Sequence, residues 1–293
     1  GEQPMEAERE LRVLEFTKIR ERLAGFCVTP MGAELCRALV PYNDFSEVTR
    51  ALDETEEANV LINYTGGSPM VWFPDVREQL SIAKKGAALS PKALLDVAAC
   101  LRSARAARTS LVKDDRDDTP ILTGVASRLT TLPTVENEIS NAILSEEEIA
   151  DRASAELYNI RRQIRATNER MRDKLNSMIH GSGFTKYLQE SIITMRGDRY
   201  CIPVKAECRA NVPGIVHDQS ATGATLFVEP VAVVEMGNDL KQLHAKEQQE
   251  ITRILQALSD MLAPHADDLL TDVELLNHLD FAFAKGMLSK SMN

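Results

Sequence analysis

Basic side chains gather in one part of this sequence. Residues 152–216 contain 12 Lys and Arg against 6 Asp and Glu, which gives a net charge of +6. Because the whole chain has a net charge of −10, the remainder carries −10 − 6 = −16. Guanidinium and ammonium groups bind phosphate oxygens. A basic segment in an acidic chain therefore indicates a nucleic-acid-binding surface, although basic residues can also simply keep a long helix solvated.

Ten of these cations are candidates for phosphate contacts. On a helix, Arg165 lies one turn after Arg161 and Arg172 lies one heptad after Arg165, all outside the apolar positions. We expect them to share one solvent-facing stripe, which Arg162, about 100° around the helix from Arg161, widens. The full set of candidates is Arg161, Arg162, Arg165, Arg172, Lys174, Lys186, Arg196, Arg199, Lys205 and Arg209.

The sequence offers little to support catalysis. The patterns GxxxxGK[ST], GxGxxG, HExxH and GxSxG are all missing. His217 and Asp218 stand beside Gln219 and Ser220 and suggest a hydrolase, but neighbouring residues on a strand point to opposite faces. We therefore predict no catalytic residue. We expect His217, Asp218 and Ser220 to pack in a turn or tip, with contact to a partner as the alternative.

The five cysteines predict neither a metal site nor a disulfide framework. Their number is odd, and no two of them form a CxxC pair. Free thiols are typical of a reducing cytoplasm, which is where we expect the protein to act. The chain has no run of 18 apolar residues, so no membrane span is expected.

Helices are expected to position most of these residues. Apolar spacing at Leu11, Leu14, Ile19 and Leu23 predicts a first helix that stops at Gly25. Capping residues and prolines then predict helices over about 30–39, 44–61, 75–86 and 91–111, with a loop over 64–74.

A change of pattern begins near residue 146. Leu157, Ile164, Met171 and Met178 recur every seven residues, and a second long apolar series runs over residues 233–261. Each series spans about 30 residues, or roughly 45 Å as a helix. We predict that residues 146–182 and 231–263 form antiparallel helices of a coiled-coil arm.

A strand-rich stretch separates the two long helices. Strands are expected over 187–195, 199–206, 214–218 and 224–228, with turns at 197–198 and 220–223. Pro203 lies within the second run, which predicts an edge strand or a bulge there. The predicted fold is mainly α, with residues 187–229 as a small β tip at the far end of the arm.

One part of this sequence is distinctive enough to suggest a family. Residues 199–230, RYCIPVKAECRANVPGIVHDQSATGATLFVEP, closely resemble the clamp tip of the second bacterial MutS family, MutS-II. The stretches LEFTKIRERLA, from Leu14, and LSPKALLDVAACLRSAR, from Leu89, are similar to the N-terminal part of that family. The resemblance extends over essentially the whole chain. Its tip-like residues are His217, Asp218, Gln219, Ser220 and Gly223.

The resemblance implies an architecture and a set of partners. It implies a helical core and lever over residues 1–145, a clamp over 146–265, and a returning lever helix over 266–293 that leads towards an ATPase domain. In such proteins the ATPase domain uses ATP and Mg²⁺, and a Smr-type nuclease domain usually follows. Members are associated with suppressing homologous recombination on branched DNA and with splitting collided ribosomes, and the complete protein is expected to be a homodimer. Since this chain lacks those domains, we expect it to have no enzymatic activity and no cofactor of its own.

Three functions remain open from the sequence. The first is a clamp that holds duplex or branched DNA. The second is a lever that binds ribosomal RNA and couples nucleotide-driven motion to ribosome splitting. The third is a structural module for dimerisation, because the methionine-containing seam would also suit pairing between chains. A long arm with basic residues suits both of the first two functions equally.

Overall fold

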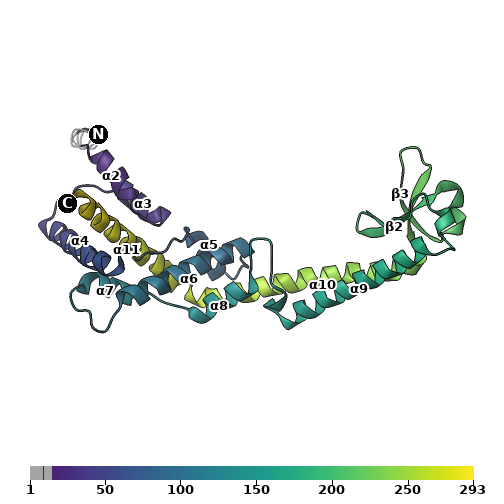
Figure 1. The fold of residues 1–293 in the computed structure, drawn as a ribbon. Helices are drawn as coiled ribbons and strands as arrows, with labels where there is room; N and C mark the ends of the chain where they lie inside the picture. The colour runs from purple at the N-terminus through teal and green to yellow at the C-terminus, as the bar shows by residue number, and fades with distance from the viewer. Residues whose placement is uncertain (1–8, 10–14) are drawn as a thin grey trace. The chain divides into compact units, whose positions relative to one another are not determined.

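The computed structural model describes residue 9 and residues 15–293, so the predicted helical positions Leu11 and Leu14 lie outside the described residues. The chain forms two compact units (Figure 1). Residues up to 150 together with 255–293 make the first unit, and residues 151–254 make the second. Helices dominate and one small antiparallel sheet accompanies them, which confirms the predicted mainly α fold with minor β. The division into core, lever and clamp stays a prediction from the resemblance.

Local capping chemistry sets several helix starts in the first unit. The Ser90 side chain accepts from the N–H of Ala93, with Pro91 at the first helical position, and Asp44 accepts from the N–H of Ser46. Both predicted starts are confirmed. The helices are α2 (Phe16–Ala24), α3 (Pro30–Arg37), α4 (Phe45–Thr65), α5 (Arg77–Lys84), α6 (Pro91–Leu111), α7 (Pro120–Ser127), α8 (Pro133–Ala142) and α11 (Ala266–Met292).

The last helix, α11, lies at the centre of the first unit. Its buried face packs against α4, α3 and α5. It also buries two aspartates that bind backbone groups. Asp280 accepts hydrogen bonds from the N–H groups of Val28 and Thr29, at 3.0 and 2.9 Å, and so fixes the start of α3. Asp272 accepts one from the N–H of Thr130 at 2.8 Å.

Two long helices form the shaft of the second unit. They are α9 (Ala155–His180) and α10 (Val231–Leu262), of which residues 231–254 belong to this unit. They run antiparallel and side by side (Figure 1), and the Ser154 hydroxyl donates to Glu250 at 2.8 Å near one end. Their shared core includes Ile164, Met171 and Leu240.

The predicted start of the first long helix, residue 146, is wrong. The helix begins nine residues later, because Ser154 accepts from the N–H of Leu157 and caps it. Before the cap, Ile149 pairs with Ile143 in an isolated bridge, and Asp151–Ala153 forms a 3₁₀ turn. The second long helix, by contrast, ends within a residue of its predicted limit.

The sheet of the second unit joins the end of α9 to the start of α10. Its strands are β1 (Thr194–Arg196), β2 (Arg199–Lys205), β3 (Gly214–Gln219) and β4 (Thr225–Pro230), in the order β1-β2-β4-β3, all antiparallel. The strand predicted over 187–195 is wrong for most of its length. Thr185–Tyr187 is a 3₁₀ turn, and Leu188 makes only a single bridge to Val204.

The prediction of an edge strand or a bulge at Pro203 is wrong. β2 has neighbours on both sides, and Pro203 stands opposite Phe227 in a regular register. The Pro203 carbonyl accepts from the N–H of Gln189 at 2.9 Å, on the side away from β4. The nitrogen of Pro203, which carries no hydrogen, points to the same side, where β1 pairs only with residues 199–201 of β2. The lack of an N–H at Pro203 therefore costs the sheet no hydrogen bond.

Candidate nucleic-acid interface

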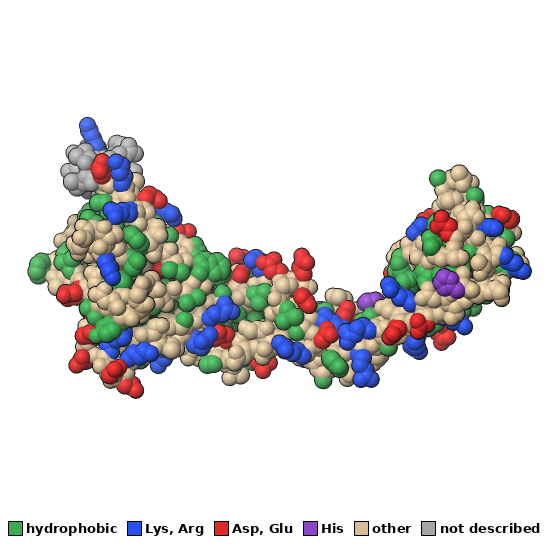
Figure 2. Space-filling view, viewed as in Figure 1, with side chains coloured by type: hydrophobic (Ala, Val, Ile, Leu, Met, Phe, Trp, Pro, Cys, Tyr) green, Lys and Arg blue, Asp and Glu red, His purple; other side chains and the backbone are tan. Residues whose placement is uncertain are grey.

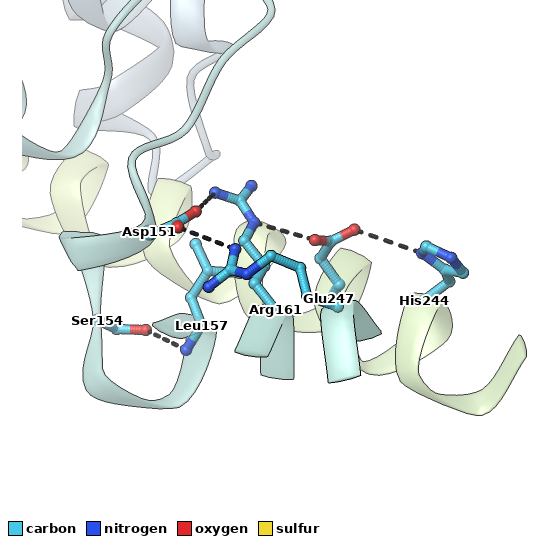
Figure 3. Close-up of polar contacts among 7 residues, drawn as sticks. Asp151, Ser154, Leu157, Arg161, His244 and Glu247 are labelled. Atoms are coloured by element: carbon cyan, nitrogen blue, oxygen red, sulfur yellow. Dashed lines mark hydrogen bonds and ion pairs between the residues drawn. The ribbon is translucent and has the colours of Figure 1, made fainter. Parts of the chain in front are cut away.

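Arg161 lies in an ion-pair network between the two shaft helices (Figure 3). Its Nη1 is 2.8 Å from Asp151 Oδ1, and its Nε is 3.0 Å from Glu247 Oε2 on α10. Arg165 Nη1 contacts the other oxygen of Asp151 at 3.2 Å. The hydrogen bond from Arg161 holds the pKa of Asp151 below its usual range. These two arginines are therefore already neutralised within the protein.

The predicted solvent-facing stripe is wrong at Arg161. Its side chain is only 19% exposed, because the residue adjoins the buried positions Ile160 and Ile164 and reaches across to α10. Arg165 keeps 58% of its side chain exposed, and Arg172 is also exposed. The helical spacing was correct, but one of the two acid partners of Arg161, Glu247, lies 86 residues away in sequence.

Arg199 is also part of the packing, at the base of the sheet. Its Nη1 lies 3.1 Å from Oε2 of Glu229, a carboxylate that is completely buried on β4. Its other nitrogen donates to Asn238 on α10. A Cβ at Gly237 would overlap Nη1 of this arginine, so any larger residue at position 237 would push the guanidinium aside. Arg199 thus ties β2 and β4 to α10.

The family-like tip residues make contacts within the sheet and its turn. The β3–β4 register shifts between Val216 and Asp218, so His217 is the extra residue of a bulge. Its Nε2 lies 3.1 Å from Glu229 Oε1. Ser220 Oγ accepts from the N–H of Thr225, and Gly223 has the positive φ of 74° that this turn requires.

Asp218 and Gln219 follow the bulge. Asp218 Oδ2 lies 3.1 Å from Arg196 Nε, and the guanidinium of Arg196 stacks over the Phe227 ring at 3.8 Å. The backbone N–H of Gln219 donates to Asp218 Oδ1 at 2.8 Å, and Gln219 pairs with Leu226 in the sheet. Arg196 is therefore compensated by an acid, as are the other three arginines described above.

The remaining candidates have no acid partner. Arg209 donates to the carbonyls of Val212 and Gly214. Lys186 lies over the ring of Tyr187. Within residue 9 and residues 15–293, no ion pair involves Arg162, Arg172, Lys174, Lys186 or Lys205, and all of these except the half-buried Lys205 are exposed.

The folded unit is less basic than the sequence segment suggested. Residues 151–254 hold 15 Lys and Arg and 13 Asp and Glu, a net charge of 15 − 13 = +2. The excess of +6 over residues 152–216 shrinks because the unit also contains Asp151, Asp218 and Glu229, and because residues 231–254 add four acids against three bases. Acidic and basic side chains are interspersed along the shaft (Figure 2). Those of the ten predicted cations that have no acid partner, rather than the net charge of the unit, define the candidate interface.

Arg172 has surroundings unlike those of the other unpaired cations. With Asn176, Met195 and Tyr200 it lines a pocket of about 350 Å³ beside β1. An aromatic ring and a guanidinium together suit a nucleobase as well as a phosphate.

Two further findings concern metals and membranes. The described residues contain no group of three or more His, Cys, Asp or Glu side chains placed to hold a metal ion. All five cysteines are free. No helix in residues 15–293 combines the length and the apolar character needed to cross a membrane.

Comparisons with known proteins give one consistent result. No protein-family model matches the chain. Three relatives named Endonuclease MutS2, from Alkaliphilus oremlandii, Clostridioides difficile and Clostridium botulinum, are 44%, 45% and 43% identical to it. The matches cover 97%, 97% and 98% of this chain but 36% of each relative. The chain therefore spans about a third of the length of the relatives that it resembles.

Proposed function

Because this chain belongs to the MutS2 family over the part that it spans, we propose that its second unit is a nucleic-acid-binding clamp. The observation that carries this proposal is that four of the predicted cations are exposed and form no ion pair within the described residues: Arg162, Arg172, Lys174 and Lys186. Three of them lie on α9 and one lies just beyond its end. They offer phosphate ligands along the helix that leads to the sheet.

An unpaired cation is the right kind of ligand for a phosphate backbone. Binding is driven largely by the counterions that phosphates release when protein cations replace them. Arg161 and Arg199 would first have to leave buried or half-buried carboxylates, which costs free energy. Arg162, Arg172 and Lys174 bear no such cost. These three residues therefore supply most of the affinity in this proposal.

The name of the relatives includes an endonuclease activity. We assign that activity, and the ATP and Mg²⁺ that the resemblance implies, to the parts of those proteins that this chain does not match. The reason is that the chain has no phosphate loop and that its described residues offer no metal cluster. On this proposal the present chain binds nucleic acid and does not cut it.

The test is a salt titration of binding by the chain and by a triple variant, R162A/R172A/K174A. The ligands are duplex DNA, branched DNA and ribosomal RNA. Removing three phosphate contacts should weaken binding at low salt and flatten the slope of log affinity against log salt for duplex DNA by about 2–3. Alanine favours helix, so helical content should not fall.

A matched control removes three exposed cations from the first unit, R102A/K113A/R128A. It changes the net charge equally and should leave the slope unchanged. If the chain binds none of the three ligands, or if both triple variants behave alike, the proposal is wrong. A loss confined to ribosomal RNA would instead support the ribosome-binding alternative.

A further inference from the structure

A polar hollow opens between the two shaft helices. It measures about 330 Å³, and its lining includes Gln163, Thr167 and Arg170 from α9 and Asp239, Gln242 and Lys246 from α10. We propose that this hollow binds a backbone phosphate of the nucleic acid, with Arg170 and Lys246 as its ligands. The inference rests on the proposed function and names a phosphate site within it.

The two cations are available for such a ligand. Both are exposed, and in the described part of the chain neither forms an ion pair. Arg170 donates to the hydroxyl of Thr167 at 3.3 Å, and Thr167 is buried in the seam between the helices. A buried anchor restricts the guanidinium beside the hollow, which lowers the entropy lost when a ligand binds.

The chemistry of the lining favours an oxyanion. A guanidinium and an ammonium supply donors only, and the amides of Gln163 and Gln242 can supply more. One carboxylate, Asp239, opposes them, so the lining has a net charge of 2 − 1 = +1. The volume of the hollow leaves room for a phosphate with some of its water.

The hollow lies between the two helices, so a ligand bound in it would contact both of them. Its two cations come from residues 76 apart in sequence, one on each antiparallel helix. A phosphate held between them would cross-link α9 and α10. Of the other proposed ligands, Arg162, Arg172 and Lys174 lie on α9, and Lys186 lies just beyond its end. Lys246 therefore extends the interface to the returning helix.

The decisive experiment compares R170A/K246A with a control, R152A/K241A. The control removes two exposed cations of the same unit that do not line the hollow. The probe is a fluorescent duplex DNA titrated at several salt concentrations. Loss of two phosphate contacts should flatten the salt slope by about 1.8, whereas the control should retain the slope of the unaltered chain.

A third variant reverses the sign of the effect. D239N removes the only carboxylate of the lining, so it should tighten binding of the same duplex. If R170A/K246A keeps the unaltered slope and affinity, or if the control weakens binding as much, the hollow is not a phosphate site.

The failure of this inference and the failure of the proposed function can be told apart. Loss of binding in R162A/R172A/K174A but not in R170A/K246A would overturn only the hollow. An unaltered chain that binds no nucleic acid would overturn both.

Discussion

Arg161 illustrates how a residue can have the right spacing and the wrong role. Its helical position placed it among the candidate phosphate ligands, yet it joins Asp151 to Glu247 with a side chain only 19% exposed. Glu247 could not be recognised as its partner from sequence, because the pairing depends on how two distant helices come together. The same holds for Arg199 and Glu229, which are 30 residues apart.

Replacing Arg161 with alanine should therefore lower stability rather than nucleic-acid affinity. The change leaves Glu247 and Asp151 without their shared partner, at a cost of about 1–3 kcal/mol in the free energy of unfolding. Urea denaturation measures the loss. R162A serves as the control and should change stability by less than about 0.5 kcal/mol, because its side chain is exposed and unpaired. Equal stability of the two variants would contradict the assigned role of Arg161.

Asp272 predicts a dependence of stability on pH. Burial raises its pKa to about 7, despite the hydrogen bond that it accepts from Thr130, and nearby Asp268 adds to the rise. In the unfolded chain the carboxyl ionises near pH ~4. Between these values the folded state binds more protons, so this group's contribution to the free energy of unfolding falls as pH rises from about 4 to 7.

The variant D272N should remove that contribution. Its amide oxygen can still accept from Thr130, and its NH₂ group replaces a carboxylate oxygen that has no hydrogen-bond partner within the described residues. We expect it to unfold at higher denaturant than the unaltered chain above pH 7, by up to about 4 kcal/mol. The advantage should vanish near pH 4. A stability difference that is constant with pH would show that Asp272 titrates normally.

At the scale of elements, the predictable features were those with local chemistry. Ser90-Pro91 and Asp44 marked helix starts because capping needs only the next few residues. Pro120 and Pro133 open α7 and α8 in the same way, so a signal for these two unpredicted helices was present. The late start of α9 was harder to predict from the sequence, because the residues before it form the bridge between Ile143 and Ile149 instead of a helix.

Replacing Gly237 of α10 with alanine should change stability in the direction opposite to the usual one. Replacing a helical glycine with alanine normally stabilises a protein by up to about 1 kcal/mol. G124A on α7 should do so, because a Cβ there meets no atom within 4 Å. G237A should instead destabilise by about 1–3 kcal/mol, because the new Cβ displaces Arg199 from Glu229.

Thermal unfolding of G124A and G237A measures both effects. The penalty of G237A should disappear in an R199A background, where the overlap no longer exists. If it persists there, the close approach of Arg199 is not the reason for glycine at this position.

At the scale of the whole molecule, charge is divided unequally between the two units. The second unit carries +2, so the first unit carries −10 − 2 = −12. An acidic first unit repels phosphate at long range, and salt weakens that repulsion. Nucleic acid should therefore contact the second unit and avoid the first.

The fold class and the antiparallel shaft could be predicted from the sequence, because long series of apolar residues at helical spacing indicate helices. It could not predict which cations remain free. That property depends on acids that lie far away in sequence, such as Glu247 of α10 beside Arg161 and Glu229 of β4 beside Arg199. The hollow could not be predicted either, because Arg170 and Lys246 come to line it only after the chain has passed through the sheet and returned.

The bulge at His217 has a consequence for self-association. β3 is an edge strand, and Ile215 and Val216 are exposed on it. A regular edge of this kind can add a strand from another molecule and seed aggregates. The bulge interrupts the spacing of the free backbone groups, and Asp218 places a charge directly after it. The buried Glu229, by contacting His217, holds the extra residue of this bulge, a feature that disfavours edge-to-edge pairing of strands.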